Sequence, residues 1–364
     1  MAWPPLFAPR RPPRPALNLA LQGGGAHGAF TWGVLDALLE ADRFEIAALS
    51  GTSAGAMNAV LLAHGLMAGG PAGARAALEA FWSGIGSHLP FEWLTVGQDD
   101  ALALNPLARL LMRWAQTLSP HELNPLGHDP LRDRLRHIDF EALRHPGRPR
   151  LAIAATHANS GRLQVFDNES LTLDALLASA CLPALHHTVT IAGEPYWDGG
   201  YSANPAVFPL LRDSRCAEDT LLVLLAPRCH AHTPRKAAEI RERAVDIAFQ
   251  APFLRELGLL HELQSAMRSG WWPRSGLERR LAQARWHLVD GAPVLAALHR
   301  ETRLIAHLPF LHRLRDAGRA AAGAWLAGPA AAVGRRSGVA LPDVLGAPAD
   351  QPSSPGVGGP AGLS

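Results

Sequence analysis

Two apolar segments, each followed by a glycine-rich turn and a helical pattern, constrain this chain most strongly. Residues 16–21 (ALNLAL) have the length of a strand and end at three glycines, and residues 28–40 carry apolar side chains at helical spacing. The order then repeats, because residues 46–50 predict a second strand that runs into GTSAG and another helix. Strands that alternate with helices in this way pair in parallel, and the helices pack on the faces of the sheet. The opening of the chain therefore predicts an α/β protein.

The rest of the chain adds strands to this sheet and helices around it. Residues 150–158 and 162–167 predict two strands that an Asn-Ser-Gly turn joins into a hairpin. Residues 220–226 predict a strand that is buried on both faces and lies in the middle of the sheet. Residues 70–150 have helical patches separated by connections rich in Pro, Gly and His, and we expect them to form an elaboration above the sheet. Further elements are expected at 72–83, 101–115, 171–182, 235–268 and 308–326 (helical) and at 187–191 and 284–289 (strands).

Segments rich in proline and glycine bound this region at both ends. Residues 1–15 carry arginines and prolines where a signal peptide needs an unbroken apolar stretch, so they predict a disordered leader. Residues 342–364 are rich in Pro, Gly, Ser and Ala without apolar periodicity, and they predict a disordered tail. Between them we expect one domain, with a core at 16–212 and a continuation at 213–330 that adds one sheet strand and the C-terminal helices.

Charge, cysteine content and hydropathy exclude several classes of protein. The net charge of +2 is too small to predict a nucleic-acid partner. Cys181, Cys216 and Cys229 form no C-x-x-C pair, so we expect neither a disulfide framework nor a zinc site, and a reducing cytoplasmic location is the default. The least polar long stretch, 317–333, contains an arginine and a proline and is shorter than the ~20 apolar residues of a membrane span. We expect a soluble protein, or one bound to a membrane only at its surface.

The segment Gly51-Thr52-Ser53-Ala54-Gly55 fits the pattern G-x-S-x-G between a predicted strand and a predicted helix. A serine at such a sharp turn exposes its hydroxyl only if its neighbours are small. The following helix then directs its N–H groups and the positive end of its dipole at developing negative charge. These features favour Ser53 as a nucleophile, although a glycine-rich turn with a serine helix cap is a simpler interpretation of the same letters.

A second glycine-rich turn, residues 23–28 (GGGAHG), has two possible uses. It satisfies G-x-G-x-x-G after a strand, but a dinucleotide site also needs an Asp or Glu at the end of the second strand. The second strand here ends in Ser50 and Gly51, and Glu45 lies before it. A glycine run at the start of a helix can instead form an oxyanion hole with its backbone N–H groups. Beside a nucleophilic serine, the oxyanion hole is the better interpretation.

A serine nucleophile needs a base, and the chain offers two kinds. Its 17 histidines leave a Ser-His-Asp triad possible. In α/β-hydrolases, however, the nucleophile follows several strands and the histidine comes last, whereas Ser53 follows the second strand. The other candidate is Asp198 in Trp197-Asp198-Gly199-Gly200, which is also a common β-turn sequence.

Taken together, these motifs resemble the patatin-like phospholipase family. The GGG-x-x-G turn, GTSAG, an A-S-x-x-x-P block at Ala178, Ser179 and Pro183, and DGG follow one another in the family's order over residues 16–212. The resemblance implies a three-layer α/β/α sandwich with a mainly parallel sheet, and a Ser–Asp dyad in place of a triad. It also implies a lipid or another acyl ester as substrate, and no metal or cofactor.

The resemblance also assigns roles to individual residues. It makes Ser53 the nucleophile and Asp198 the base. The family usually has Lys or Arg where this chain has His27, which puts the charge at that position in doubt. The oxyanion hole would comprise Gly23, Gly24, Gly25 and Ala54, and the supporting motif residues would be His27, Gly28, Gly51, Gly55, Gly199 and Gly200.

The implied activity is cleavage of carboxylic esters of lipids, as a phospholipase A or a lysophospholipase. We expect partial burial to raise the pKa of Asp198, because an aspartate near pKa ~3.9 is a weak base at pH 7. A nucleotide-binding domain and a catalytically silent scaffold remain the alternatives. Trp271 and Trp272, between Arg268 and Arg274, either anchor the protein at a lipid surface or cover a core.

Overall fold

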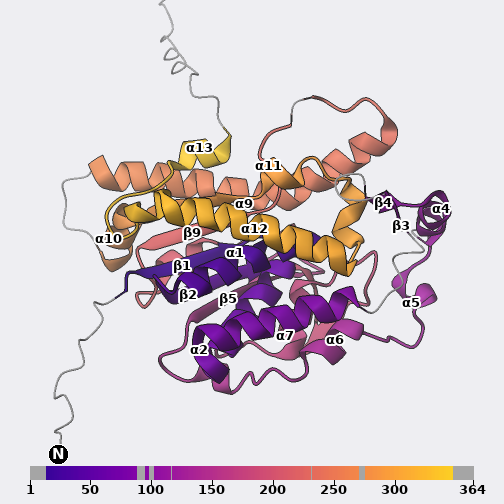
Figure 1. The fold of residues 1–364 in the computed structure, drawn as a ribbon, viewed down its shortest axis with the longest axis horizontal. Coiled ribbons are helices and arrows are strands. Elements are labelled where there is room, and N and C mark those ends of the chain that lie inside the picture. The colour runs from indigo at the N-terminus through magenta and orange to yellow at the C-terminus, as the bar shows by residue number, and fades with distance from the viewer. Residues whose placement is uncertain are drawn as a thin grey trace, which may run out of the picture.

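A computed structural model describes residues 14–87, 95–97, 102–115, 117–230, 232–269 and 275–346. Its centre is one eight-stranded sheet with the order β10-β9-β1-β2-β5-β8-β7, in which β6 pairs with β5 (Figure 1). The five strands from β10 to β5 are parallel, and β6, β7 and β8 are antiparallel to their neighbours. The strands are β1 (Ala16–Leu21), β2 (Glu45–Thr52), β5 (Arg150–His157), β6 (Leu163–Asp167), β7 (Val189–Ile191), β8 (Glu194–Asp198), β9 (Asp219–Leu224) and β10 (Arg285–Asp290).

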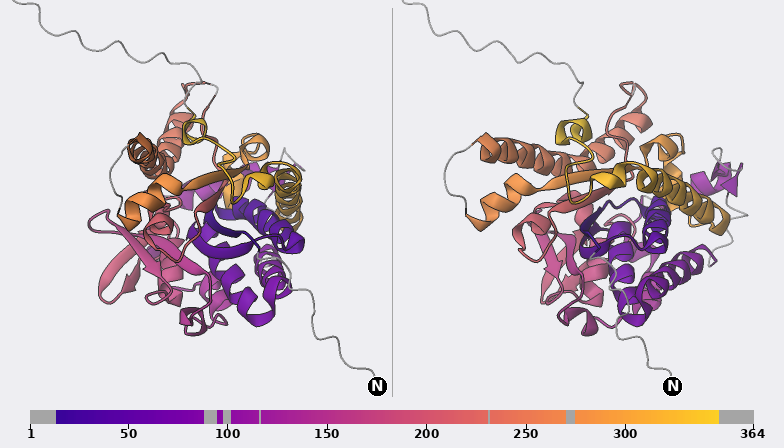
Figure 2. Two further views of the ribbon diagram at one scale, coloured as in Figure 1. Left: turned by 90° about the vertical axis from the view of Figure 1, so that its left-hand side faces the viewer. Right: turned by 60° about the vertical axis from the view of Figure 1, so that its left-hand side comes forward.

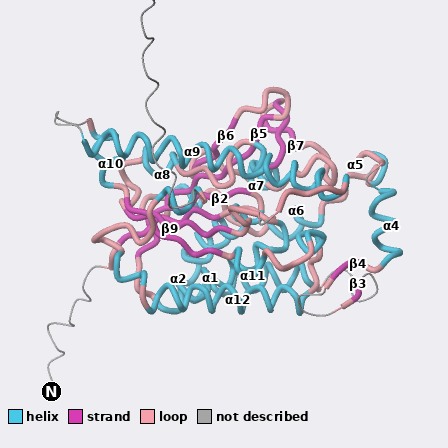
Figure 3. The backbone as a smooth tube through the Cα atoms, turned by 90° about the horizontal axis from the view of Figure 1, so that it is seen from above, coloured by secondary structure: helices cyan, strands magenta, loops and turns pink. Residues whose placement is uncertain are grey.

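Helices cover both faces of the sheet, so the protein is a three-layer α/β/α sandwich (Figures 2 and 3). One layer contains α1 (Gly28–Ala41), α2 (Ala54–Gly86), α7 (Leu173–Ser179) and α12 (Leu308–Ala327), and the other contains α8 (Phe208–Arg212), α9 (Ala237–Ser269), α10 (Gly276–Gln283) and α13 (Leu341–Leu345). A core lies on each face of the sheet, the first against the layer that contains α1 and the second against the layer that contains α9. Side chains alternate along the strands, so that Leu19 and Leu21 pack in the first core and Ala20 packs in the second. Shorter elements are α4 (Pro106–Ala115), α5 (Pro120–Leu123), α6 (Pro130–Leu135), α11 (Ala292–Leu295) and the two-stranded β3 (Thr95–Val96) and β4 (Ala103–Leu104).

The expected fold class is confirmed, and three local expectations are wrong. Residues 72–83 continue α2 beyond a kink at Gly69 and Gly70 and bury Leu78 and Trp82 in the core, instead of forming an elaboration above the sheet. The continuation after residue 213 contributes two strands, β9 and β10, as the patterns at 220–226 and 284–289 predict, and not the single strand expected for that part of the domain.

The third wrong expectation concerns the tail. It was expected to be disordered from residue 342, but α13 is helical to Leu345 because Leu341 and Val344 are buried against the second core. Residues 347–364 and 1–13 lie outside the described residues, as do Trp271 and Trp272. Within the described part of the chain, no helix is long and apolar enough to cross a membrane.

The register of the sheet brings the sequence motifs to one end. Leu21 at the end of β1 pairs with Gly51 near the end of β2, so the glycine-rich turn and the Ser53 turn leave neighbouring strands at the same level. Asp198 ends the antiparallel β8 opposite Ala155, near the end of β5. The carboxyl ends of the parallel strands therefore gather all three motifs, which is where ligands bind in open α/β sheets. This is the right-hand end of Figure 1, where α4 and α5 also lie.

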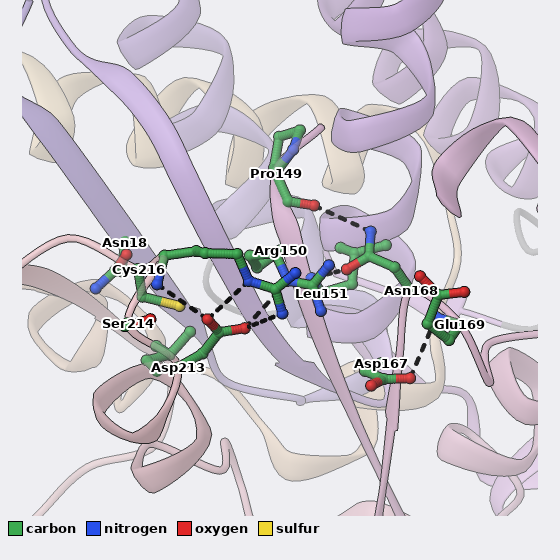
Figure 4. A network of polar contacts seen from close by, with 12 residues as sticks. Asn18, Pro149, Arg150, Leu151, Asp167, Asn168, Glu169, Asp213, Ser214 and Cys216 are labelled. Carbon is green, nitrogen blue, oxygen red and sulfur yellow. Dashed lines mark hydrogen bonds and ion pairs between the residues drawn. The ribbon is translucent and has the colours of Figure 1, made fainter. Parts of the chain in front are cut away.

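Paired charges and amides occupy the opposite end of the sheet. Arg150 at the start of β5 donates from Nε to Asp213 Oδ2 over 3.2 Å (Figure 4). Asn168 accepts from Leu151 N–H at 2.9 Å, and its amide donates to the carbonyl of Pro149 at 3.1 Å. These bonds fix the start of β5 to the end of α8 through Asp213 and to the loop after β6 through Asn168.

Candidate active site

Ser53 lies in a strained turn between β2 and α2. Its backbone has φ 56° and ψ −124°, a conformation that non-glycine residues rarely adopt. Such a conformation persists where the surrounding structure enforces it, and it is frequent at functional sites. The turn is tight, because a Cβ on Gly51 would lie 2.5 Å from the carbonyl oxygen of Gly55. Ser53 N–H donates to Ser179 Oγ over 3.0 Å, which holds the turn from outside. The side chain of Ser53 is half-buried at the start of α2, as the G-x-S-x-G pattern predicts.

The glycine-rich turn after β1 packs directly against Ser53. A Cβ on Gly23 would lie 2.8 Å from Ser53 Cβ and 2.6 Å from the carbonyl oxygen of Thr52, so only glycine fits there. Gly23 N–H donates to Asn204 Oδ1 over 2.7 Å and is therefore occupied. Gly25 has φ +60°, and its Cα faces the carbonyl of Arg303 so closely that a Cβ would collide with it.

The remaining amides of the predicted oxyanion hole are available. Among the described residues, the N–H groups of Gly24, Gly25 and Ala54 have no hydrogen-bond acceptor. Ala54 N–H opens α2 beside Ser53, where the helix dipole favours negative charge. These three amides fit an oxyanion hole better than that of Gly23 does, since Gly23 already binds Asn204.

Asp198 is a buried carboxylate that forms no ion pair with a residue that the structure describes. Its side chain is 1% exposed, and its Oδ1 accepts from Gly200 N–H at 2.7 Å. In the described part of the chain, its Oδ2 has no hydrogen-bond partner of regular geometry, although the nearby Ser53 hydroxyl lowers the pKa of the carboxyl. Burial outweighs both contributions and raises the pKa of Asp198 to about 7. The raised pKa agrees with the expectation from the sequence.

One short segment at the end of α7 supports both Ser53 and Asp198. Ser179 Oγ accepts from Ser53 N–H, and two residues later the carbonyl of Cys181 accepts from Asp198 N–H over 2.8 Å. Thr156 Oγ1 donates to the carbonyl of Asp198 over 2.8 Å and fixes it to β5. Burial raises the pKa of the Cys181 thiol to about 11, so this sulfur stays protonated at neutral pH.

The remaining motif residues shape the two turns. His27 is buried and hydrogen-bonded through Nε2 to Thr302 Oγ1 at 2.8 Å. Burial, with Arg303 nearby, lowers the pKa of His27 to about 3, so it carries no charge at neutral pH. Four glycines allow close packing: Gly28 lies against Ala54 and Trp82, Gly55 against Leu21, Gly199 against Ala154 and Gly200 against Phe249.

Sequence reasoning assigned no role to two residues that hold this site together. Ser179 belongs to the A-S-x-x-x-P block, which is the one signal that could have indicated it. Asn204 has no comparable signal, because its bond to Gly23 spans 181 positions of the chain. Among the described residues, no histidine hydrogen-bonds to Ser53 or to the Asp198 carboxylate, and no three His, Cys, Asp or Glu side chains group as metal ligands.

Comparison with known proteins places this site in a family. A model of the patatin-like phospholipases matches residues 19–211, which is more than half of the chain. This chain belongs to the patatin-like phospholipase family. The match includes the glycine-rich turn, the Ser53 turn and Asp198, and membership supports lipid hydrolase activity for this patatin-like protein.

Two solved structures resemble the patatin-like protein at low sequence identity. VipD from Legionella pneumophila is 14% identical, with a TM-score of 0.35 over 84% of this chain and 67% of the other. The ExoU–SpcU complex from the type III secretion system of Pseudomonas aeruginosa includes a chain that is 20% identical. That match has a TM-score of 0.25 over 88% of this chain and 77% of the other. A comparison with curated proteins found no match.

Proposed function

We propose that this patatin-like protein is a serine acyl hydrolase that cleaves carboxylic esters of lipids, as a phospholipase A or a lysophospholipase does. Ser53 is the nucleophile and Asp198 is the base. The observation that carries the proposal is the state of Asp198, which is buried beside the Ser53 hydroxyl, forms no ion pair with the described residues and has a pKa of about 7. A carboxylate with such a pKa is a far better base near neutral pH than an ordinary aspartate.

The proposed reaction proceeds through an acyl-enzyme. Asp198 takes the proton of the Ser53 hydroxyl while Ser53 Oγ attacks the ester carbonyl carbon, and the carbonyl oxygen becomes an oxyanion. When the tetrahedral intermediate collapses, the bond to the alcohol oxygen breaks and protonated Asp198 returns its proton to that oxygen. Asp198 then takes a proton from water, whose oxygen attacks the acyl carbon. In the second collapse the bond between the acyl carbon and Ser53 Oγ breaks, protonated Asp198 returns its proton to Ser53 Oγ, and the fatty acid leaves.

Backbone N–H groups stabilise both intermediates in this scheme. Those of Gly24, Gly25 and Ala54 are the donors in reach of an oxyanion formed at Ser53, and each such donor contributes about 10²–10³-fold to the rate. His27 is neutral, so the stabilisation comes from amides and the α2 dipole rather than from a charge at that position.

The packing of the glycine-rich turn weakens the nucleotide-binding alternative. In a dinucleotide site the glycines leave room for a pyrophosphate, whereas Gly23 here makes room for Ser53 and Gly25 makes room for the carbonyl of Arg303. β2 ends at Thr52 and Ser53 follows it, where that alternative needs an acidic side chain. A catalytically silent scaffold stays an alternative that experiment distinguishes.

The deciding experiment labels wild type, Ser53→Ala and Asp198→Asn with a fluorophosphonate probe and measures hydrolysis of short-chain and long-chain nitrophenyl esters. We expect labelling and turnover in the wild type, and loss of both by about 10³-fold or more in each variant. Circular dichroism shows whether the variants fold.

Other outcomes point to the alternatives. Full activity in Asp198→Asn would mean that another group is the base. A folded wild type that neither labels nor turns over would favour the silent scaffold, or nucleotide binding if a fluorescent nucleotide binds at micromolar concentration.

A further inference from the structure

The short helix α4 turns its apolar side chains to solvent. Leu107, Leu110, Leu111 and Trp114 follow helical spacing along one stripe, and each is 54% to 65% exposed. The polar contact of the helix points inward instead, because Arg109 Nε donates to Glu301 Oε1 over 2.8 Å. A soluble protein normally places such a stripe in its core. The apolar side of α4 therefore faces away from the core, whereas a helix that packs to stabilise the fold turns this side toward the core.

Glu301 attaches α4 to the oxyanion side of the active site. It lies in the 3₁₀ helix Arg300–Leu304 and also accepts from Leu104 N–H over 3.3 Å. Two residues further, the carbonyl of Arg303 packs against Gly25. The exposed stripe is thus joined to the glycine-rich turn through one short helix.

Three further exposed leucines lie around the Asp198 side of the same end. Leu123 ends α5, and Leu126 follows it with 93% of its surface exposed. His187 Nε2 donates to the carbonyl of Pro120 over 3.1 Å, which joins α5 to the segment after Cys181, where Leu185 is also exposed. That segment begins at the carbonyl that binds Asp198 N–H.

We propose that these residues form an apolar rim that docks on an anionic phospholipid surface. The rim comprises Leu107, Leu110, Leu111 and Trp114 of α4 together with Leu123, Leu126 and Leu185. The inference rests on the proposed function, since it places the Ser53–Asp198 end of the sheet against the layer that holds a lipid ester. Figure 1 shows α4 and α5 together at that end.

The composition of α4 favours lipid over a protein partner. Residues 106–115 contain two arginines and no acidic residue. Arg109 is paired with Glu301, which leaves one arginine of this segment in excess. An excess of positive charge favours an anionic lipid interface, and tryptophan suits its headgroup layer.

The test compares vesicle binding of wild type, Leu110→Glu/Leu111→Glu and Trp114→Ala by co-sedimentation. The vesicles contain phosphatidylcholine with or without phosphatidylglycerol. The control, Leu259→Glu/Leu263→Glu, adds the same charge at two exposed leucines of α9. Hydrolysis of a short soluble ester reports whether each variant keeps a folded active site.

We expect wild type and control to bind phosphatidylglycerol vesicles alike, the α4 double variant to bind about ten-fold more weakly or worse, and Trp114→Ala to fall between them. Soluble-ester turnover stays equal in all four. Equal binding by wild type and the α4 variants, or no wild-type binding, overturns the proposal. So does a dimer in gel filtration that Leu110→Glu/Leu111→Glu dissociates without changing vesicle binding. Vesicle binding that depends on α4 in a wild type without esterase activity would support the rim and refute the proposed function.

Discussion

The carboxyl groups at the two ends of the central sheet have opposite electrostatic environments. At the amino ends of the strands, Asp213 binds Arg150 and Arg215, and Asp219 binds Arg285 and His287. These partners hold the pKa of both carboxyls below the ordinary value. At the carboxyl ends, Asp198 has no cationic partner among the described residues, and burial raises its pKa to about 7.

This difference shows how one sheet separates stability from chemistry. Paired carboxylates at the amino ends satisfy their hydrogen bonds and fix the strands and their loops (Figure 4). The carboxyl ends instead retain a strained serine, and a carboxylate oxygen and amides without hydrogen-bond partners among the described residues, each of which costs stability in the resting protein. The exposed leucines of the apolar rim lie at that same end.

The largest expected effect comes from Asp198→Asn, which should lower activity by about 10³-fold or more and raise stability above pH 7. Burial raises the pKa of Asp198 from 3.8 to about 7, so the folded state binds this proton more tightly than the unfolded chain. That contribution to stability is present below about pH 4 and is lost as the pH rises through 7. Asn cannot ionise, so the variant should gain up to about 4 kcal/mol at pH 8 and almost nothing at pH 4. Urea unfolding at both pH values measures it, and a destabilised variant at pH 8 would contradict it.

Asp219→Asn should have the opposite effects to Asp198→Asn, because it should lower the free energy of unfolding and leave turnover unchanged. Asp219 is buried and accepts from Arg285 at 2.7 Å and 2.9 Å, and its loss leaves a guanidinium with fewer partners. Removing one member of such a buried pair costs about 3 kcal/mol. The half-buried Asp213→Asn serves as a control with an expected cost of about 1 kcal/mol. Urea unfolding measures the free energies of unfolding of the variants. A loss of kcat in folded Asp219→Asn would contradict the view that the carboxylates at the amino ends of the strands contribute to stability alone.

The pH dependence of kcat/KM should report the raised pKa of Asp198. The base must be deprotonated, so kcat/KM for a soluble ester should fall about 50-fold between pH 7 and pH 5, with a slope that approaches ten-fold per pH unit well below 7. His27, whose pKa is lowered to about 3, makes the fold less stable as the pH falls below its ordinary value of 6.5, so circular dichroism must show that the protein is still folded at pH 5. The stability linked to Asp213 and Asp219, whose pKa values are lowered, persists until the pH falls below the unfolded value of 3.8. An acid limb near pH 4 would mean that Asp198 is not the base.

The smallest effect should follow from Ser179→Ala, which removes the acceptor of Ser53 N–H. An unpaired amide in a strained turn costs about 1–2 kcal/mol, so we expect kcat to fall about ten-fold with little change in KM. Ser179→Thr keeps an Oγ acceptor and should restore most of the rate. Equal loss in both variants would point to packing at the end of α7 instead of the hydrogen bond.

Local sequence was sufficient for much of the fold. The apolar runs predict β1, β2, β5, β6 and β9 within two residues, because strand length, turn glycines and buried periodicity are local properties. It failed where distant contacts decide. Gly69 and Gly70 break α2 as their sequence indicates, but the placement of the following helical segment in the core, instead of above the sheet, depends on the burial of Leu78 and Trp82. In the same way, α13 begins a proline-rich tail and is helical because it packs against α9.

For the candidate site, the sequence by itself determined the chemical groups and the order in which they occur. It indicated Ser53 after the second strand, glycines after the first and Asp198 in a glycine turn, because strand–turn–helix motifs depend on neighbouring residues. Only the tertiary structure decided their electrostatic state. The raised pKa of Asp198, the low pKa of His27 and the bond from Gly23 to Asn204 all depend on burial by residues far along the chain. Desolvation is set by everything that surrounds a group, and the sequence does not list those surroundings.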